Sequence, residues 1–388
     1  MARSLTDELP AQAQWIDQKA LNVIPNVLPP IELNGSSIWI PEGATAEALK
    51  EKPFHVYDEE FLAVIGPNPT LTLLARTDTD PIFHEAVVWY PPTDEVFVCQ
   101  NAGAKAAGTG LNKSATIAKI SLKQADAVTE LRNASGKVDV ITIPHTQVVN
   151  PNGATNYKGN LVYMAEGQGP NIASELILMN PLEPYNTTVL LNNYFGRAFN
   201  SLNDGVVNPR NGDIYFTDVT YGYMQDFRPL PGMPNQVYRY NGDTGAVTVV
   251  ADQLVLPNGI CFSPSANYLY VTDGGAQRAF YGYNSSAVSS IYRYEVQEDG
   301  TLENRKLFTY VHTGIPDGVH TDSAGNVYSS VGDGVHVWNP SGKLIGKIYL
   351  GEGSANFRFA GKGRMVIGAE TNLFYARIKA SGSDFIEL

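Results

Sequence analysis

A polar corner recurs through this chain, each time directly before a short apolar strand, and it limits the fold more than any other feature. Asn258-Gly259 opens one such unit, Asn203-Asp204-Gly205 opens the unit before it, and Asp317-Gly318 opens the unit after it. Internal similarity of this kind is typical of a repeat architecture. We therefore expect each unit to place one polar side chain at an equivalent position.

The spacing of equivalent residues supports the repeat. Tyr215, Tyr270 and Tyr328 occupy the same place in successive units and lie 55 and 58 residues apart. Six units can be counted, and each reads as four short strands, as expected for a β-propeller. The predicted fold is therefore all-β: a six-bladed β-propeller with four-stranded antiparallel blades around a central channel. A β-sandwich is the alternative, but it would not explain the recurring corner.

The domain organisation follows from where the repeat begins. Residues 1–75 read as an irregular N-terminal lead-in that packs on the propeller, and residues 76–388 read as the propeller, a single domain. The stretch that starts at Leu71 is a strand candidate that could close the ring with the C-terminal end.

Composition excludes some partners. The chain has 27 Lys and Arg against 39 Asp and Glu, a net charge of −12 spread along its length. Nucleic acid is not an expected partner, because phosphate binding needs clustered basic residues. The chain has no run of 18 apolar residues, so the sequence does not predict a membrane-spanning helix. Cys99 and Cys261 lie in apolar strand-like runs and are expected to be buried thiols, while a disulfide would require the fold to bring the two strands together.

Glycosylation signals bear on localisation. Five Asn-x-Ser/Thr triplets occur, and together they favour a secreted glycoprotein in a mature form without its signal peptide. A cytosolic protein with chance triplets is the alternative. The triplets begin at Asn34, Asn112, Asn133, Asn186 and Asn284.

The polar residues at the unit openings form the candidate site. In a propeller the innermost strands converge on the channel, so residues at their starts should face one another. Asn-Gly and Asp-Gly are common in turns, and any one corner could be only that. Two carboxylates together with several amide oxygens would make a hard oxygen site, which suits Ca²⁺ better than zinc or copper. The six openings carry Glu85, Asn152, Asn203, Asn258, Asp317 and Asn356.

Several long phrases resemble a known family. They are WIDQKALNV, EKPFHVYDEEF, DPIFHEAVVWYPP, NNYFGRAFNSLNDG and GDGVHVWNPSGKLIGKIY. Together with the corners they resemble the senescence marker protein/gluconolactonase family of six-bladed propellers, and most of all its fungal lactonohydrolase group. The resemblance implies a Ca²⁺ site whose ligands are Glu85, Asn203, Asn258 and Asp317. The gluconolactonase branch carries an Arg where this chain has Ser201, so that sugar contact is not inherited, and Asn200 and Arg197 are nearby substitutes.

The same resemblance implies an activity: Ca²⁺-dependent hydrolysis of aldonolactones or D-pantonolactone to the hydroxy acid, a carboxylic ester hydrolase reaction on a small molecule. Two alternatives stay open. A phosphotriesterase-like hydrolase could use the same metal site, and a non-catalytic propeller could use Ca²⁺ only to hold its blades together. The sequence leaves the oligomeric state, monomer or homodimer, undecided.

Catalysis would need a group that handles the attacking water. Asp317 is the first candidate, although a cation lowers the basicity of a carboxylate that it binds. His84 and His320 are the others, because a histidine titrates near neutral pH. Strand alternation disfavours both, since it would place His84 opposite Glu85 and gives His320 the opposite parity to Asp317. Candidates for substrate contacts are Asn152, Glu166, Asn200, Tyr221 and Asn356.

Overall fold

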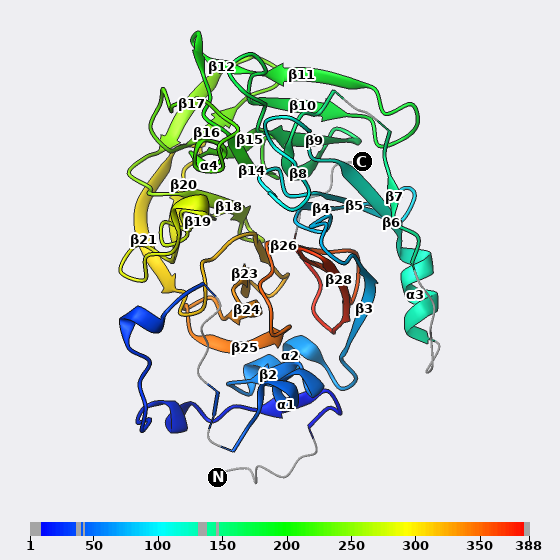
Figure 1. The fold of residues 1–388 in the computed structure, drawn as a ribbon, viewed down its shortest axis with the longest axis vertical. Helices are drawn as coiled ribbons and strands as arrows, with labels where there is room; N and C mark the ends of the chain where they lie inside the picture. The colour runs from blue at the N-terminus through cyan, green and yellow to red at the C-terminus, as the bar shows by residue number, and fades with distance from the viewer. Residues whose placement is uncertain (1–8, 36–39, 42, 131–137, 145–146, 384–388) are drawn as a thin grey trace.

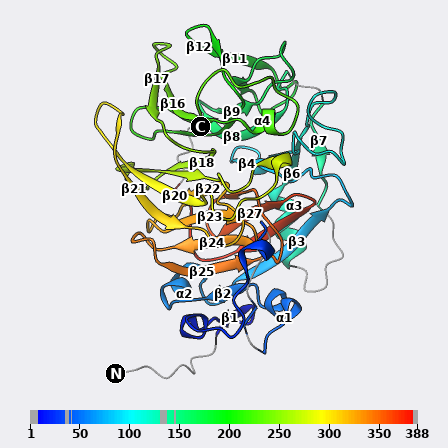
Figure 2. The same ribbon diagram turned by 60° about the vertical axis from the view of Figure 1, so that its left-hand side comes forward.

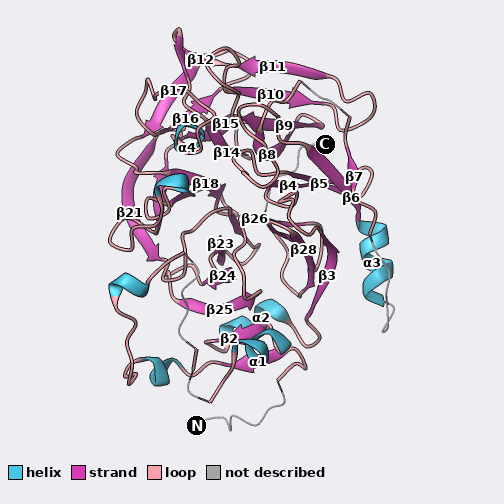
Figure 3. Ribbon diagram, viewed as in Figure 1, coloured by secondary structure: helices cyan, strands magenta, loops and turns pink. Residues whose placement is uncertain are grey.

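A computed structural model describes residues 9–35, 40–41, 43–130, 138–144 and 147–383. Six blades of four antiparallel strands each stand in a ring, one of them extended to a six-stranded sheet, which confirms the predicted six-bladed β-propeller (Figure 1). The described chain is mostly strand, with a few short helices (Figure 3). Among these residues no helix has both the length and the apolar character to cross a membrane.

The blades follow one another in chain order, each with its first strand innermost. Blade one contains β4 (Glu85–Tyr90), β5 (Glu95–Cys99), β6 (Ile117–Ser121) and β7 (Ile141–Thr142). Blade two contains β8 (Pro151–Tyr157), β9 (Asn160–Ala165), β10 (Glu175–Met179) and β11 (Thr187–Leu191). Blade three contains β14 (Leu202–Val207), β15 (Ile214–Asp218), β16 (Gln236–Tyr240) and β17 (Val247–Ala251). A small hairpin, β12 (Asn193–Tyr194) with β13 (Arg197–Ala198), separates blades two and three.

Blade four contains β18 (Pro257–Phe262), β19 (Tyr268–Asp273), β20 (Ser290–Val296) and β21 (Leu302–Tyr310). Blade five contains β22 (Val319–Thr321), β23 (Val327–Val331), β24 (Gly334–Trp338) and β25 (Leu344–Tyr349). Blade six takes β26 (Asn356–Phe359), β27 (Arg364–Ala369) and β28 (Asn372–Arg377) from the C-terminal end. Alternating apolar residues of neighbouring blades pack together between the sheets, so the core is divided into several inter-blade clusters.

The ring is closed by a strand from the other end of the chain. β3 (Thr70–Arg76) pairs antiparallel with β28, with Thr70 opposite Arg377 and Arg76 opposite Asn372. This confirms the closing role predicted for the stretch that starts at Leu71. The expected boundary between residues 75 and 76 falls inside β3, so the propeller's sheets begin at Thr70.

The N-terminal lead-in adds strands to blade five. β2 (Phe54–Val56) pairs antiparallel with β25, and β1 (Ala13–Trp15) pairs parallel with β2, which gives a six-stranded sheet. Two short helices, α1 (Ala46–Glu51) and α2 (Glu60–Ile65), flank β2 (Figure 2). Thr45 caps α1 by accepting a hydrogen bond from the Ala48 amide, and Gly66, at φ +74°, ends α2. The lead-in therefore lies against one side of the ring.

The remaining helices lie in the connections. α3 (Leu122–Glu130) joins β6 to β7, and α4 (Tyr221–Met224) follows β15. Three 3₁₀ turns complete the described elements, η1 (Gln18–Leu21), η2 (Pro30–Glu32) and η3 (Ala279–Tyr281). Cys99 and Cys261 are both buried free thiols, as the bland interpretation of the sequence expected.

The corner glycines have a steric role that the turn interpretation missed. They lie in or just before the innermost strands. Gly153, Gly259 and Gly318 face the opening of the next blade, whereas Gly205 faces Met164 of the blade before. A Cβ atom at Gly259 would lie 2.3 Å from the carbonyl oxygen of Asp317, and one at Gly153 would lie 2.5 Å from Oδ1 of Asp204. Such distances are too short for any side chain. Glycine is therefore required here because neighbouring openings pack directly against one another around the channel.

Candidate functional site

One end of the channel opens into a pocket of about 410 Å³ at the beginnings of the innermost strands. Eight of the residues singled out in the sequence line it, and they come from five blades and the loop after β15. The structure therefore brings together side chains that lie more than 230 residues apart in the chain. These eight are His84, Glu85, Asn152, Glu166, Asn203, Tyr221, Asn258 and Asp317.

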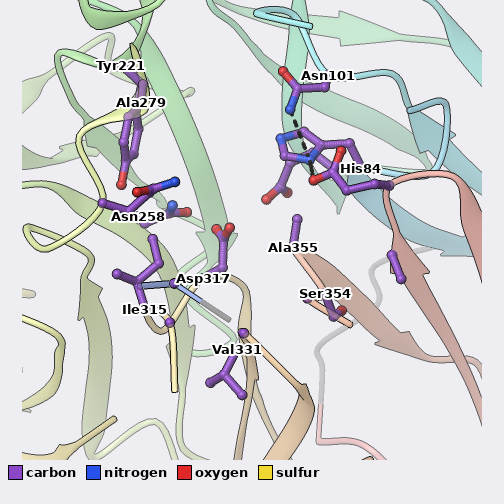
Figure 4. Close-up of a pocket in the computed structure, with 18 of the residues that line it drawn as sticks. His84, Asn101, Tyr221, Asn258, Ala279, Ile315, Asp317, Val331, Ser354 and Ala355 are labelled. Atoms are coloured by element: carbon purple, nitrogen blue, oxygen red, sulfur yellow. Dashed lines mark hydrogen bonds and ion pairs between the residues drawn. The ribbon is translucent and has the colours of Figure 1, made fainter. Parts of the chain in front are cut away.

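Local breaks in strand pairing aim these side chains into the channel. Pairing between β18 and β19 is interrupted between Pro257 and Ile260, so that Asn258 and Gly259 fall in the interruption. The same shift occurs in β4, β8 and β14. A bulge bends its strand and redirects the side chains next to it. Figure 4 shows the result, with the Asp317 carboxylate between Asn258 on one side and His84 on the other.

Among the described residues, four amide or carboxylate oxygen atoms in this pocket are buried without a hydrogen-bond partner, as is the hydroxyl oxygen of Tyr221. The four are the Oδ1 atoms of Asn152, Asn203, Asn258 and Asp317. A buried polar atom without a partner costs about 1–3 kcal/mol, and native proteins leave few of them. Several in one pocket are what a site for a hard cation would present, since such an ion binds carboxylate and amide oxygens.

The donor set also limits which metal fits. In the described part of the chain, no group of three or more His, Cys, Asp or Glu side chains is arranged to hold a metal ion. A cation in this pocket would therefore depend on the asparagine oxygens. Amide and carboxylate oxygens suit Ca²⁺, whereas zinc and copper prefer sulfur and imidazole ligands.

The two carboxylates of the predicted ligand set are strongly perturbed. Glu85 is 2% exposed, and its Oε2 accepts a hydrogen bond of 2.6 Å from Nδ2 of Asn356. Burial and the neighbouring Asp317 raise the pKa of Glu85, while burial, followed by the charges of Glu370 and Asp204, raises the pKa of Asp317 to about 8. A cation bound between these two buried carboxyl groups would lower their raised pKa values, because a nearby positive charge favours the ionised form.

A second polar group lies beside the ligand set. Glu166 accepts hydrogen bonds from Nδ2 of Asn152 and Oγ of Ser201, both at 3.1 Å. Burial raises the pKa of Glu166 to about 7. Ser201, the position at which the resemblance implied a missing Arg, is buried and places its hydroxyl group against this carboxyl group. The suggested substitute Arg197 donates to the carbonyl oxygen of Gly232 and is exposed.

His84 lines the pocket together with Glu85, contrary to the expectation from strand alternation. The reason is local: β4 begins at Glu85, so His84 precedes the strand, and pairing with β5 shifts directly after Glu85. Nδ1 of His84 lies 2.7 Å from Oε1 of Glu370. Although burial opposes it, the charge of Glu370 raises the pKa of His84 to about 9.

Three of the predicted residues do not line this pocket. His320 lies deeper in the channel, where it borders a small cavity with Asp204 and Arg358 and contacts the Phe357 ring at 5.0 Å between ring centres. Asn356 borders the same cavity and reaches the pocket only through its hydrogen bond to Glu85. Asn200 binds the carbonyl oxygen of Met233 with its side chain.

Among the lining residues that escaped the sequence analysis, two lie beside His84. Glu370 follows β27 and Asn101 follows β5, and both lie at the pocket wall beside His84. Neither belongs to the recurring corner, which marks only the start of each innermost strand. The one available signal was an acidic residue in the very short connection Glu370-Thr371 between two apolar strands, a place where Gly or Asn is more usual.

The chain is similar to several proteins of known name. The lactonohydrolase oryL of Aspergillus oryzae is 28% identical over 343 residues, which cover 84% of this chain and 73% of the relative. The gluconolactonase of Zymomonas mobilis is 30% identical over 208 residues, which cover 50% of this chain and 55% of the relative. A solved gluconolactonase from Xanthomonas campestris superposes with a TM-score of 0.65 at 24% identity, covering 84% of this chain and 95% of that one.

A match to a whole family is more general than any single relative. Residues 124–369 match the family described as SMP-30/Gluconolactonase/LRE-like region. This span holds Asn152, Asn203, Asn258 and Asp317, whereas Glu85 precedes it. It also covers more than half of the chain and five of the six blade openings. The protein described by these blades and this pocket therefore belongs to the SMP-30/gluconolactonase/LRE-like family.

Proposed function

We propose that this protein hydrolyses lactones in the channel pocket with the help of a bound Ca²⁺ ion. The observation that carries the proposal is the set of unpaired buried oxygens of Asn203, Asn258 and Asp317, which face the same pocket as Glu85. Membership of the family and the names of two relatives, a lactonohydrolase and a gluconolactonase, support ester hydrolysis on a lactone ring.

The residues would divide the work as follows. Glu85, Asn203, Asn258 and Asp317 would hold the ion, and a bound Ca²⁺ supplies a positive charge that stabilises negative charge developing on the lactone carbonyl oxygen. Asp317 and His84 both line the pocket, so either could orient a water molecule there, and whichever of the two is deprotonated could take its proton. Asn152 and Glu166 would bind hydroxyl groups of the substrate.

The shape of the pocket favours a small substrate. Its volume of about 410 Å³ falls in the range of small-molecule sites. Ile315, Val331 and Ala355 provide an apolar wall, while Asn152 and Glu166 provide a polar one. An aldonolactone or D-pantonolactone, with a polar ring and a compact carbon skeleton, has matching chemistry. We propose these as the substrate class.

The test is a panel of lactones followed by titration of the released acid, with and without EDTA. We expect hydrolysis of at least one aldonolactone or of D-pantonolactone, its loss on chelation, and recovery on adding Ca²⁺, while circular dichroism shows the strands intact. Activity that resists EDTA would refute the role of the cation. Hydrolysis of an organophosphate and of no lactone would favour the phosphotriesterase alternative, and no turnover at all would favour a binding propeller.

We also propose secretion as a glycoprotein. Asn112, Asn186 and Asn284 are exposed, which an acceptor site requires. The triplet at Asn133 lies outside the described residues, and the triplet at Asn34 extends into them only in part. Mass spectrometry of the natural protein before and after removal of N-linked glycans tests this. An unchanged mass would contradict it.

A further inference from the structure

Glu370 has a left-handed backbone conformation, which is more usual for glycine or asparagine than for glutamate. It lies in the two-residue connection between Ala369 and Asn372, which pair at the ends of β27 and β28. Its φ is +57°, in the left-handed region that costs a residue other than glycine about 1–2 kcal/mol. Its backbone is also bound to the neighbouring blade, because its carbonyl oxygen accepts the Phe83 amide at 2.9 Å. A glutamate retained at a strained position suggests a use for its side chain.

The side chain of Glu370 reaches the residue after Phe83. Its Oε1 lies 2.7 Å from Nδ1 of His84. An ionised carboxylate can only accept hydrogen bonds, so the hydrogen of this pair belongs to Nδ1. That holds for both neutral and protonated imidazole. Nε2 is therefore the atom left to the pocket, and among the described residues it has no hydrogen-bond partner.

We propose that Glu370 is a positioning residue that fixes the tautomer and the ring orientation of His84, so that Nε2 faces the substrate beside the metal ligands. This inference rests on the proposed lactone hydrolysis and deepens it. Glu370 belongs to the last blade and His84 to the start of the first, so the pair spans the junction at which the ring closes. Glu370 would act on the reaction chiefly through His84, because its charge also bears on Asp317.

A purely structural ion pair would behave differently. The side chains of His84 and Glu370 are 17% and 44% exposed. Ion pairs with this much exposure contribute little to stability, typically under about 1 kcal/mol. A positioning role predicts a large effect on turnover with a small effect on unfolding. A structural role predicts the reverse.

A double-mutant cycle measures the dependence on His84. In the wild-type background we expect Glu370→Ala to lower kcat/KM by about 10- to 100-fold, the usual cost of losing a residue that orients a ligand or base. In a His84→Ala background the same change should have a much smaller effect, limited to the influence of the Glu370 charge on Asp317. Glu370→Gln keeps an acceptor oxygen and should retain most of the activity. Glu60→Ala, which removes an exposed carboxylate paired with Lys343 far from the pocket, is the matched control.

A second readout is independent of turnover. Long-range ¹H–¹⁵N spectra of the folded protein distinguish the two imidazole tautomers, and His84 can be assigned among the six histidines by its loss in His84→Gln. At a pH above the His84 pKa of about 9, where the imidazole is neutral, we expect a hydrogen on Nδ1 in the wild type and in Glu370→Gln, and a mixture in Glu370→Ala. An unchanged tautomer together with unchanged kcat/KM, or additive effects in the cycle, would overturn the inference. If no lactone is hydrolysed, the spectra still decide the positioning, and only the proposed function fails.

Discussion

Asp333 offers the sharpest test of how the buried charges of blade five stabilise the fold. It lies between β23 and β24 and is 3% exposed. Its Oδ1 lies 2.6 Å from Nε2 of His336, and its Oδ2 lies 3.1 Å from Nζ of Lys347, which is itself 5% exposed. Although burial opposes it, these two neighbours hold the pKa of Asp333 well below its usual range. The change Asp333→Asn removes the charge and keeps the size.

The expected loss can be worked out from these contacts. Lys347 would remain buried beside His336 without a neutralising partner, and breaking a buried ion pair in this way costs about 3–5 kcal/mol. Lys343 provides the comparison, because its pairs with Asp58 and Glu60 lie on the surface. Lys343→Met should cost under about 1 kcal/mol. The expected losses in free energy of unfolding therefore differ several-fold between the two substitutions, although each breaks an ion pair.

Equilibrium unfolding in denaturant, followed by tryptophan fluorescence, measures both values. Trp338 is buried in the same blade and reports on its integrity. The double variant Asp333→Asn with Lys347→Met removes the uncompensated charge, so it should recover part of the loss. A free energy of unfolding for Asp333→Asn within about 1 kcal/mol of wild type would refute the reasoning. A double variant less stable than the single would also count against it.

Other expectations follow from the pocket and the lead-in. Asn258→Leu removes one unpaired oxygen and should weaken Ca²⁺ binding at least about tenfold by calorimetry without unfolding the protein. Gly259→Ala should weaken the same binding, because its Cβ would press on the Asp317 carbonyl oxygen; unaltered affinity would contradict the packing of the corners. No lysine or arginine lines the described pocket, so lactones that carry a phosphate or sulfonate should show a much lower kcat/KM than neutral ones of the same ring, and equal values would disprove this. Burial lowers the pKa of His55 to about 4 in the folded protein, whereas an unfolded histidine titrates near 6.5. The unfolded state therefore takes up the proton first as pH falls through this window, and wild type should lose more stability there than His55→Phe.

Sequence reasoning reached the architecture and most of the pocket because both depend on a repeated element. Asn203, Asn258 and Asp317 occupy equivalent positions in their blades. Because the blades are arranged around one axis, equivalent positions at the innermost strands lie close together in space. The directions of His84 and His320 were harder to predict. Strand alternation disfavoured both, yet His84 faces the pocket because β4 starts after it, while His320 lies within β22 and points deeper into the channel. The positions at which strands begin and bulge depend on packing between blades, so they cannot be predicted from the local sequence pattern alone.

The corners explain why the site and the ring closure depend on each other. Gly259 leaves room for the backbone of Asp317, and Gly318 leaves room for Asn356, whose amide in turn binds Glu85. Each opening is thus positioned by its neighbour, and the series returns to the first blade only because β3 completes the last one. Outer strands tolerate change because they contact solvent, whereas a shift at one opening is passed to the next. The geometry of the oxygen ligands is therefore a property of the closed ring, and loss of the β3 pairing should disorder the pocket before it disorders the individual blades.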